Sequence, residues 1–230
     1  MSDKFSFNKN ITYKTNKLAK FFSNNRLTFD DFYKSEKVML ETIDWFENIS
    51  VLDVGCGCGG LGKALNEKFN VLSYTGIDIN EQSINQAFIL NNNLPFSFLQ
   101  CDILEFKTRN LFDVVVSFSC VDWNAETLPM IRKCWKLIKP GGHFLATFRL
   151  ADQIKKEAHS SYQHINFVGE KNGEVAPYVV FSYSDIFKMG HDLGCEDISL
   201  NGYFNVPSSS AVTHHKELFF CCVSYKKPRR

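Results

Sequence analysis

Residues 51–60 join a short apolar run to a turn in which glycine alternates with cysteine, and this spacing suits ligand binding. The segment reads Val-Leu-Asp-Val-Gly-Cys-Gly-Cys-Gly-Gly, and the residues after it, 61–68, have a helical composition. A strand, a tight turn and a helix start bring backbone N–H groups against a ligand. Glycine also permits positive φ values and lets a ligand touch the main chain. The segment therefore predicts a ligand-binding turn.

Three aspartates accompany the first three expected strands. Asp53 lies inside the strand before the glycine turn, while Asp78 and Asp102 end the next two strands. Each aspartate can equally well cap a following helix. Capping does not easily explain why three aspartates follow the first three strands in register with one glycine turn. Parallel strands present their carboxyl ends at one edge of the sheet, and ligands bind at that edge. We expect the three carboxylates to share one cleft.

The glycines alone leave two cofactor classes open. Residues 57–62 fit the G-x-G-x-x-G dinucleotide fingerprint, which is weak by itself. A carboxylate such as Asp78 can accept hydrogen bonds from both ribose hydroxyls in either class. The Tyr-x-x-x-Lys spacing of many hydride-transfer enzymes occurs only ahead of the glycine turn, at residues 13–17 and 33–37, so it gives no support to an NAD(H) oxidoreductase.

The order apolar–apolar–Asp–apolar–Gly–x–Gly–x–Gly over residues 51–59 resembles the first motif of class I S-adenosylmethionine-dependent methyltransferases of the small-molecule type. The resemblance covers residues 27–225. It implies that Asp53 organises the amino-acid end of S-adenosylmethionine, that Asp78 binds its ribose and that Asp102 accepts from its adenine. Three of the implied residues have a simpler alternative: Ile79 and Ile103 could pack in the core, and Ser119 could cap the start of a helix. The implied cofactor-binding residues are Asp53, Gly55, Gly57, Gly59, Asp78, Ile79, Asp102, Ile103 and Ser119.

The resemblance implies that the acceptor lies over the end of the fourth strand, at residues 117–124. This run, Ser-Phe-Ser-Cys-Val-Asp-Trp-Asn, has no Asn/Asp-Pro-Pro-Tyr/Phe motif and no Pro-Cys pair. Amino methylation of nucleic acids and C5 methylation of cytosine are therefore disfavoured. Trp123 matches the aromatic residue that small-molecule enzymes of the family often have here. Asp122 is a candidate general base, and the alternative is an N-terminal capping box with Glu126.

Residues 150–182 are predicted to form an inserted lid over the acceptor. The segment is polar and irregular, but it contains two aromatic runs that we expect to pair as extra strands. Tyr162 and Tyr178 are candidate substrate contacts. His164 is a candidate base, with a structural role as the alternative. The mixture of aromatic and amide side chains suits a hydroxylated, sugar-like ligand.

The elements that must position these residues alternate strand with helix. Five strands with four helices predict βαβ units and a parallel sheet, and two late strands follow another helix. We expect a doubly wound α/β fold with helices on both faces, and the resemblance to class I methyltransferases implies a mostly parallel seven-stranded sheet that ends in a C-terminal antiparallel strand pair. The expected strands are 50–54, 73–77, 96–100, 112–119, 143–148, 196–204 and 217–225, and the expected helices are 27–46, 60–68, 81–91, 126–138 and 184–193.

Composition sets the broad class. The chain has 230 residues, 44% of them hydrophobic, and a net charge of +1, which suits one domain. A basic N-terminal arm (1–26) and a basic tail (226–230) flank an acidic methyltransferase domain (27–225). The eight cysteines include no C-x-x-C pair, so we expect free thiols and no metal. With no membrane-length apolar run and no signal-peptide core, a cytoplasmic location is expected.

These observations predict an S-adenosylmethionine-dependent methyltransferase that moves a methyl group to a small polar metabolite, such as a hydroxyl of a sugar-like acceptor. Its partner would be that small molecule, without a nucleic acid or a membrane. Two alternatives remain open. One is an RNA- or protein-directed enzyme that docks through the basic arm, and the other is a non-catalytic cofactor-binding subunit.

Overall fold

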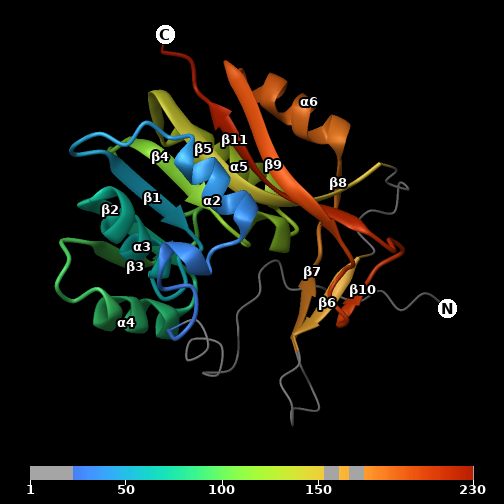
Figure 1. The fold of residues 1–230 in the computed structure, drawn as a ribbon, viewed down its shortest axis with the longest axis horizontal. Helices are drawn as coiled ribbons and strands as arrows, with labels where there is room; N and C mark the ends of the chain where they lie inside the picture. Colours follow the sequence, from blue (N-terminus) through green and yellow to red (C-terminus); the bar gives the residue numbers. More distant parts are fainter. Residues whose placement is uncertain (1–22, 153–160, 166–173, 230) are drawn as a thin grey trace.

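One large sheet forms the centre of the molecule in the computed structural model, which describes residues 23–152, 161–165 and 174–229 (Figure 1). Its order is β3-β2-β1-β4-β5-β11-β9. The first five strands are parallel, and β11 is antiparallel to both β5 and β9. The predicted fold class is confirmed. The strands are β1 (Ser50–Val54), β2 (Ser73–Asp78), β3 (Ser97–Gln100), β4 (Phe112–Ser117), β5 (Ile138–Ala151), β9 (Asp197–Asn205) and β11 (Leu218–Lys226), with the short β8 (Phe181–Ser182) beside β5.

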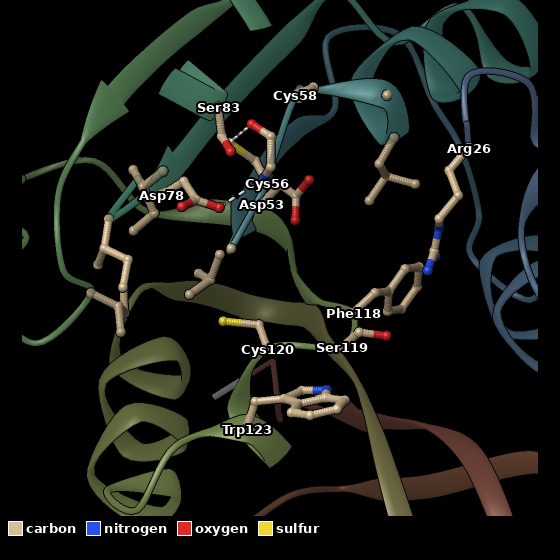
Figure 2. A pocket seen from close by; sticks show the side chains of 18 of the residues that line it. Arg26, Asp53, Cys56, Cys58, Asp78, Ser83, Phe118, Ser119, Cys120 and Trp123 are labelled. Carbon is tan, nitrogen blue, oxygen red and sulfur yellow. Dashed lines mark hydrogen bonds between the residues drawn. The ribbon is translucent and has the colours of Figure 1, made fainter. Parts of the chain in front are cut away.

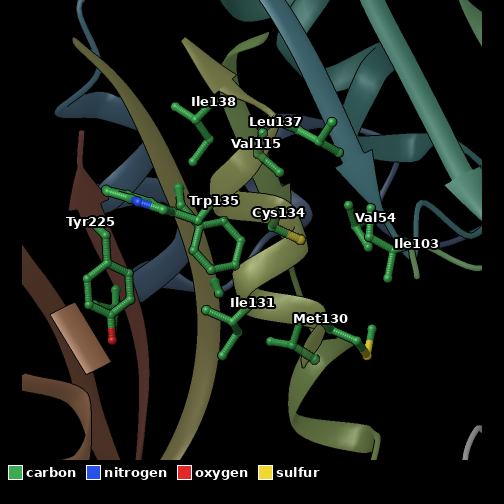
Figure 3. Close-up of a cluster of buried hydrophobic side chains, with 14 of the residues drawn as sticks. Val54, Ile103, Val115, Met130, Ile131, Cys134, Trp135, Leu137, Ile138 and Tyr225 are labelled. Carbon is green, nitrogen blue, oxygen red and sulfur yellow. The ribbon is translucent and has the colours of Figure 1, made fainter. Parts of the chain in front are cut away.

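Helices cover both faces of this sheet. On one face, α2 (Lys34–Glu41), α3 (Gly60–Phe69) and α4 (Glu81–Leu90) share an apolar cluster. On the other face, α5 (Thr127–Lys136) and α6 (Tyr183–Leu193) pack against a cluster that includes Trp135 and Tyr225 (Figure 3). Along β4, Val115 enters the second cluster, while Val114 and Val116 enter the first. The uninterrupted valine run is therefore explained by a strand that is buried on both faces.

The expected helix over 27–46 is wrong in length. The structure has the 3₁₀ turn η1 (Phe29–Asp31) followed by α2, which begins at Lys34 and ends at Glu41. Two separate N-terminal caps cause the break. Asp31 accepts hydrogen bonds from the backbone N–H of Thr28, and Glu36 accepts one from that of Tyr33. Each cap starts a new element, so the apolar stripe is divided between two short ones.

The strand expected over 143–148 is longer in the structure, because β5 begins at Ile138 and includes Lys-Pro-Gly-Gly at 139–142. The pairing of β5 with β4 shifts register between Phe112 and Val114, and Gly141 has a φ of 81°. A bulge of this kind lets proline and glycine lie inside a strand.

A second, small sheet lies beyond the carboxyl ends of the parallel strands (Figure 1). It has the order β10-β6-β7 and is antiparallel. Its strands are β6 (Tyr162–Ile165), β7 (Glu174–Pro177) and β10 (Ala211–Val212). The aromatic run at 161–167 thus contributes an extra strand, but the expected pairing with the run at 177–181 is wrong, because β6 pairs with residues 174–177 and Phe181 lies in β8 beside β5. The predicted basic arm and lid also include residues 1–22, 153–160 and 166–173, which lie outside the described residues. Within the described ranges, no helix has the length and apolar character needed to cross a membrane.

Candidate functional site

The carboxyl ends of β1, β2 and β3 open into a cavity, here called the first cavity (Figure 2). Asp53 and Asp78 lie on one side of it, and Ser119, Cys120 and Trp123 lie on the other (Figure 2). All three predicted aspartates contribute to its wall, so the structure brings them together. Of the nine residues predicted to bind the cofactor, eight line this cavity: Asp53, Gly55, Gly57, Asp78, Ile79, Asp102, Ile103 and Ser119.

The three glycines of the turn have positive φ values for different reasons. Gly57 has a φ of 53°, and a Cβ added there would meet nothing within 4 Å. This open space is where a ligand can approach the main chain. A Cβ on Gly55 would come within 2.5 Å of Cys120 Sγ. Gly59 caps α3 in the left-handed conformation, and it is absent from the lining because it packs against Asn91 and Phe98.

Asp78 connects the end of β2 to the glycine turn. Its Oδ2 accepts a hydrogen bond of 2.9 Å from the Gly57 N–H, and its Oδ1 accepts one of 2.8 Å from the Asn80 N–H. Burial raises the pKa of this carboxyl, and the backbone donors act in the opposite direction. A carboxylate has about four lone-pair sites. Asp78 is therefore held rigidly and keeps acceptor capacity for ligand hydroxyls.

Asp53 lies deeper in the same wall and is 3% exposed. Its Oδ2 accepts a short hydrogen bond from the Tyr74 hydroxyl. Burial raises its pKa to about 7, and the nearby charge of Asp78 adds to this effect. A cationic ligand group beside Asp53 would stabilise its ionised form.

The third strand contributes Asp102 and Ile103. Asp102 Oδ1 accepts a hydrogen bond of 2.9 Å from the Leu104 N–H, which fixes the loop after β3. Ile103 is buried, and it belongs to the apolar cluster as well as to the cavity wall. Both readings of this isoleucine, core packing and ligand contact, are thus compatible with its position.

Arg26 and Phe32 also line the first cavity, and sequence reasoning missed both. Arg26 Nη2 is 2.7 Å from Glu36 Oε2, and its guanidinium lies 4.5 Å from the centre of the Phe32 ring. Arg26 was assigned to the basic N-terminal arm, outside the predicted domain. The signal that was available is the aromatic run beginning three residues later, which anchors this segment against the sheet.

A second cavity of about 310 Å³ adjoins the first. Ser119 and Trp123 line both cavities and so form their common wall. Ser119 has a φ of 51°, and its N–H donates a hydrogen bond of 2.6 Å to Thr147 Oγ1. Left-handed backbone at a residue other than glycine is strained and is typical of functional positions. The second cavity is lined by Tyr33, Ser35, Ser119, Asp122, Trp123, Thr147, Phe148, Arg149, Gln163, Tyr178, Tyr203, Asn205, Ser208, Phe220 and Cys221.

Asp122 lies in the 3₁₀ turn η2 (Val121–Trp123) and points to the second cavity. Its Oδ2 is 3.1 Å from Arg149 Nη1, and burial raises its pKa while Arg149 acts in the opposite direction. The capping alternative is wrong, because the side chain of Asn124 accepts the hydrogen bond from the Glu126 N–H instead. Asp122 is therefore available to the cavity.

Of the three site residues predicted in the lid, one lines a cavity and two do not. Tyr178 and Trp123 line the second cavity, and their rings meet edge to face at 5.6 Å. Tyr162 and His164 contact each other, with ring centres 5.3 Å apart, and line neither cavity. Alternate side chains of a strand point to opposite faces, so Gln163 reaches the cavity in their place. The roles predicted for Tyr162 and His164 stay predictions without a contact in either cavity.

Comparison with known proteins supports one family. Residues 46–191 match the model of a family described as "Methyltransferase domain". A malonyl-[acyl-carrier protein] O-methyltransferase of Priestia megaterium is 29% identical over 155 residues, which cover 64% of this chain and 56% of that protein. A ubiquinone biosynthesis O-methyltransferase of Vibrio vulnificus is 30% identical over 109 residues, covering 46% of each. The chain thus spans about half the length of these relatives.

Among solved structures, magnesium protoporphyrin IX methyltransferase of Synechocystis with bound S-adenosylmethionine superimposes with a TM-score of 0.55 at 16% identity. The match covers 93% of this chain and 85% of that one. This similarity shows the fold, and the family model, which covers more than half of the chain, shows the family. The chain belongs to the class I S-adenosylmethionine-dependent methyltransferases.

Proposed function

We propose that this protein transfers a methyl group from S-adenosylmethionine to a hydroxyl of a small, sugar-like acceptor bound in the second cavity. The observation that carries the proposal is the common wall of Ser119 and Trp123, because a methyl donor and its acceptor must meet across a short gap. The relatives named above are O-methyltransferases, which favours oxygen as the acceptor atom.

In this proposal the first cavity holds the cofactor. Asp78 accepts from the ribose hydroxyls and Asp102 from the adenine amino group, with Ile79 and Ile103 on the faces of the base. Asp53 faces the ammonium of the amino-acid end, and Arg26 faces its carboxylate. The open space at Gly57 supports this placement, because it leaves room for the ligand against the main chain.

The lining of the second cavity supports a hydroxylated acceptor. Three tyrosines, a tryptophan and two phenylalanines supply ring faces, while serine, threonine, asparagine and glutamine side chains supply hydrogen-bond donors and acceptors. Trp123 and Tyr178 are the proposed aromatic contacts. The volume of about 310 Å³ is near the lower end of the range for small-molecule pockets. It suits a single ring rather than a long chain.

S-adenosylmethionine supplies an electrophilic methyl group on a sulfonium sulfur. During transfer the C–S bond breaks, a C–O bond forms and the hydroxyl proton must leave. Asp122 is the proposed proton acceptor, because its Oδ1 is buried and has no hydrogen-bond partner among the described residues. A raised pKa makes a carboxylate a stronger base. Transfer of the proton to Oδ1 leaves neutral thioether, neutral ether and protonated Asp122.

The test is turnover with a panel of monosaccharide glycosides and cyclic polyols, measured as S-adenosylhomocysteine release. We expect turnover with a hydroxylated ring, and a loss of about 100-fold or more in kcat for Asp122→Asn, in line with the usual contribution of a general base. Calorimetry with S-adenosylhomocysteine should give the same affinity for this variant as for the unmodified protein.

A matched control is Asp113→Asn, which changes a carboxylate at the start of β4, far from both linings. It should leave kcat unchanged. Cofactor binding without turnover on any hydroxylated ring would contradict the proposed acceptor class, and failure to bind S-adenosylhomocysteine would contradict the cofactor site.

A further inference from the structure

Arg149 is a buried cation in the wall of the second cavity, and it is paired with the proposed base, Asp122. It lies near the end of β5 and is 4% exposed. Its guanidinium contacts both rings of an edge-to-face pair, 4.1 Å from the centre of Trp123 and 3.9 Å from the centre of Tyr178. Its Nη1 donates a hydrogen bond of 2.9 Å to the main-chain carbonyl of Asp122. The rings and the carbonyl fix the guanidinium in place.

Asp122 and Arg149 are the only charged side chains in the described lining of this cavity. They neutralise each other through Asp122 Oδ2, at 3.1 Å. Asp122 Oδ1 is buried and has no hydrogen-bond partner among the residues that the structure describes. The charges in this wall are therefore paired with each other, and Asp122, a residue of the wall, carries one buried acceptor atom without a partner among the described residues.

This arrangement discriminates against charged ligands of either sign. A carboxylate near Arg149 would also face the ionised oxygen of Asp122, and an ammonium near Asp122 would also face the guanidinium. Each ion would lose its hydration without gaining an unopposed partner. A neutral hydroxyl avoids this cost, because its O–H donates to Asp122 Oδ1 while its oxygen, or that of a neighbouring hydroxyl, accepts from the guanidinium.

We propose that the Asp122–Arg149 pair is a charge filter that admits neutral hydroxylated acceptors and rejects carboxylates and ammonium groups. This inference rests on the proposed function and narrows its acceptor class. Arg149 acts through Asp122 as a positioning and specificity-determining residue, since its ion pair is made with Oδ2 and leaves Oδ1 without a partner among the described residues.

The experiment uses three ligands with the same ring and different charge: a methyl glucoside, the corresponding glucuronic acid glycoside and the corresponding glucosamine glycoside. The protein is saturated with S-adenosylhomocysteine, and binding of each ligand is measured by calorimetry or ligand-observed NMR. We expect the neutral glucoside to bind at least tenfold more tightly than either charged ligand.

Two variants should shift this preference in opposite directions. Asp122→Asn leaves Arg149 as an uncompensated cation, so the uronic acid should gain at least tenfold relative to the glucoside. Arg149→Met leaves Asp122 unopposed, so the amino sugar should gain instead. Arg149→Lys retains the charge and should retain the order of the three ligands. A residue with a merely structural role would weaken all three ligands alike.

The affinity for S-adenosylhomocysteine shows whether each variant is folded, and the unmodified protein alone tests the order if a variant is not. A charged ligand that binds the unmodified protein best, or binding of none of the three to the loaded protein, would overturn the charge filter. Failure to load S-adenosylhomocysteine would instead overturn the proposed function, so the two failures are distinguishable.

Discussion

The two cavities meet at Ser119 and Trp123, but they are built in opposite ways. The first cavity takes most of its wall from a continuous stretch, residues 53–103, at the ends of three neighbouring parallel strands. The second takes its wall from segments between Tyr33 and Cys221 that are brought together by α2, β5, β9, β11 and the small sheet. Most of the first wall comes from one stretch of the sequence, whereas the second wall is assembled from segments that lie far apart in the sequence.

This difference has a functional consequence. In the proposed function the first cavity binds the cofactor through the glycine turn and carboxylates at the ends of parallel strands, the edge where open α/β sheets bind ligands. The second cavity depends on side chains of strands and loops that can vary without altering the sheet. Cofactor identity and acceptor choice should therefore respond to different substitutions.

Among the substitutions that test this difference, Asp78→Ala should have the largest effect, on the affinity for S-adenosylhomocysteine. The substitution removes the acceptor of two backbone hydrogen bonds together with the proposed ribose contact. Hydrogen bonds to charged groups contribute roughly 1.5–3 kcal/mol each, so affinity for S-adenosylhomocysteine should fall about 100-fold in calorimetry.

The matched control is Asp113→Ala, which also removes a carboxylate that accepts a backbone hydrogen bond, from Ser50 at 2.8 Å. Asp113 lies at the amino end of β4, away from the cavity. It should cost stability and leave the affinity unchanged. Equal losses of affinity in the two variants would show that Asp78 acts through the fold and not through the ligand.

The first cavity could be predicted from the sequence because its signals are local. The glycine turn and the three aspartates each follow from a strand end, and parallel strands place those ends at one edge. Gly59 shows the limit of such reasoning. Its positive φ suits the same turn, but whether its Cα faces the cavity or Phe98 depends on how α3 packs.

The second largest effect is expected from Gly57→Ala, which should lower the affinity for S-adenosylhomocysteine about tenfold or more. Gly59→Ala is the variant with which it is compared. Both residues have positive φ, so both alanines are strained. The alanine methyl at 57 projects into open space on the cavity wall, while that at 59 would come within 2.8 Å of Asn91 and Phe98. Gly57→Ala should therefore weaken S-adenosylhomocysteine binding more than it lowers the melting temperature.

Gly59→Ala should show the reverse, with a large loss of stability and a smaller loss of affinity in whatever protein stays folded. Thermal denaturation and calorimetry on the same samples separate the two effects. Identical profiles for the two variants would mean that the turn acts as a single unit, without the division of roles that the geometry indicates.

The second cavity could not be predicted in the same way. Gln163 and His164 are adjacent in sequence, and only the register of β6 decides which of them reaches the ligand. Arg149 lies one residue beyond the expected strand 143–148, and it packs against Trp123 and Tyr178 from other segments. Arg26 lies before any predicted element. These positions are set by tertiary packing, which periodicity does not encode.

A third and smaller effect concerns pH. Burial raises the pKa of Asp53 to about 7 from an ordinary 3.8, so the folded protein retains a proton that the unfolded chain releases at lower pH. The cofactor ammonium should favour the ionised form, so binding releases this proton. If the pKa of Asp53 falls by about one unit on binding, affinity for S-adenosylhomocysteine rises about fivefold from pH 6 to pH 8.

Calorimetry in two buffers with different ionisation enthalpies measures the released proton directly. Asp53→Asn removes the titrating group and should abolish both the proton release and the rise in affinity. The same variant should flatten the stability profile, since a raised pKa makes the folded protein lose stability as pH rises from about 4 to about 7. A pH dependence that persists in Asp53→Asn would assign it to another group.

The smallest effect is expected at the common wall of the two cavities. Ser119 has a φ of 51°, which costs a residue with a Cβ roughly 1 kcal/mol and glycine almost nothing. Ser119→Gly should therefore raise the free energy of unfolding by about 0.5–1 kcal/mol in chemical denaturation. The gain is modest because a glycine also increases the entropy of the unfolded chain.

The rate of methyl transfer by Ser119→Gly, measured beside its stability, tests whether the strain at this residue has a function. Ser119 holds the loop to β5 through the hydrogen bond from its N–H to Thr147 Oγ1, and a main-chain donor survives replacement by glycine. If strain at Ser119 keeps the common wall in its working geometry, the more stable variant should transfer methyl groups more slowly with cofactor affinity unchanged. A variant that is more stable and equally active would show that the strain has no role in joining the two cavities.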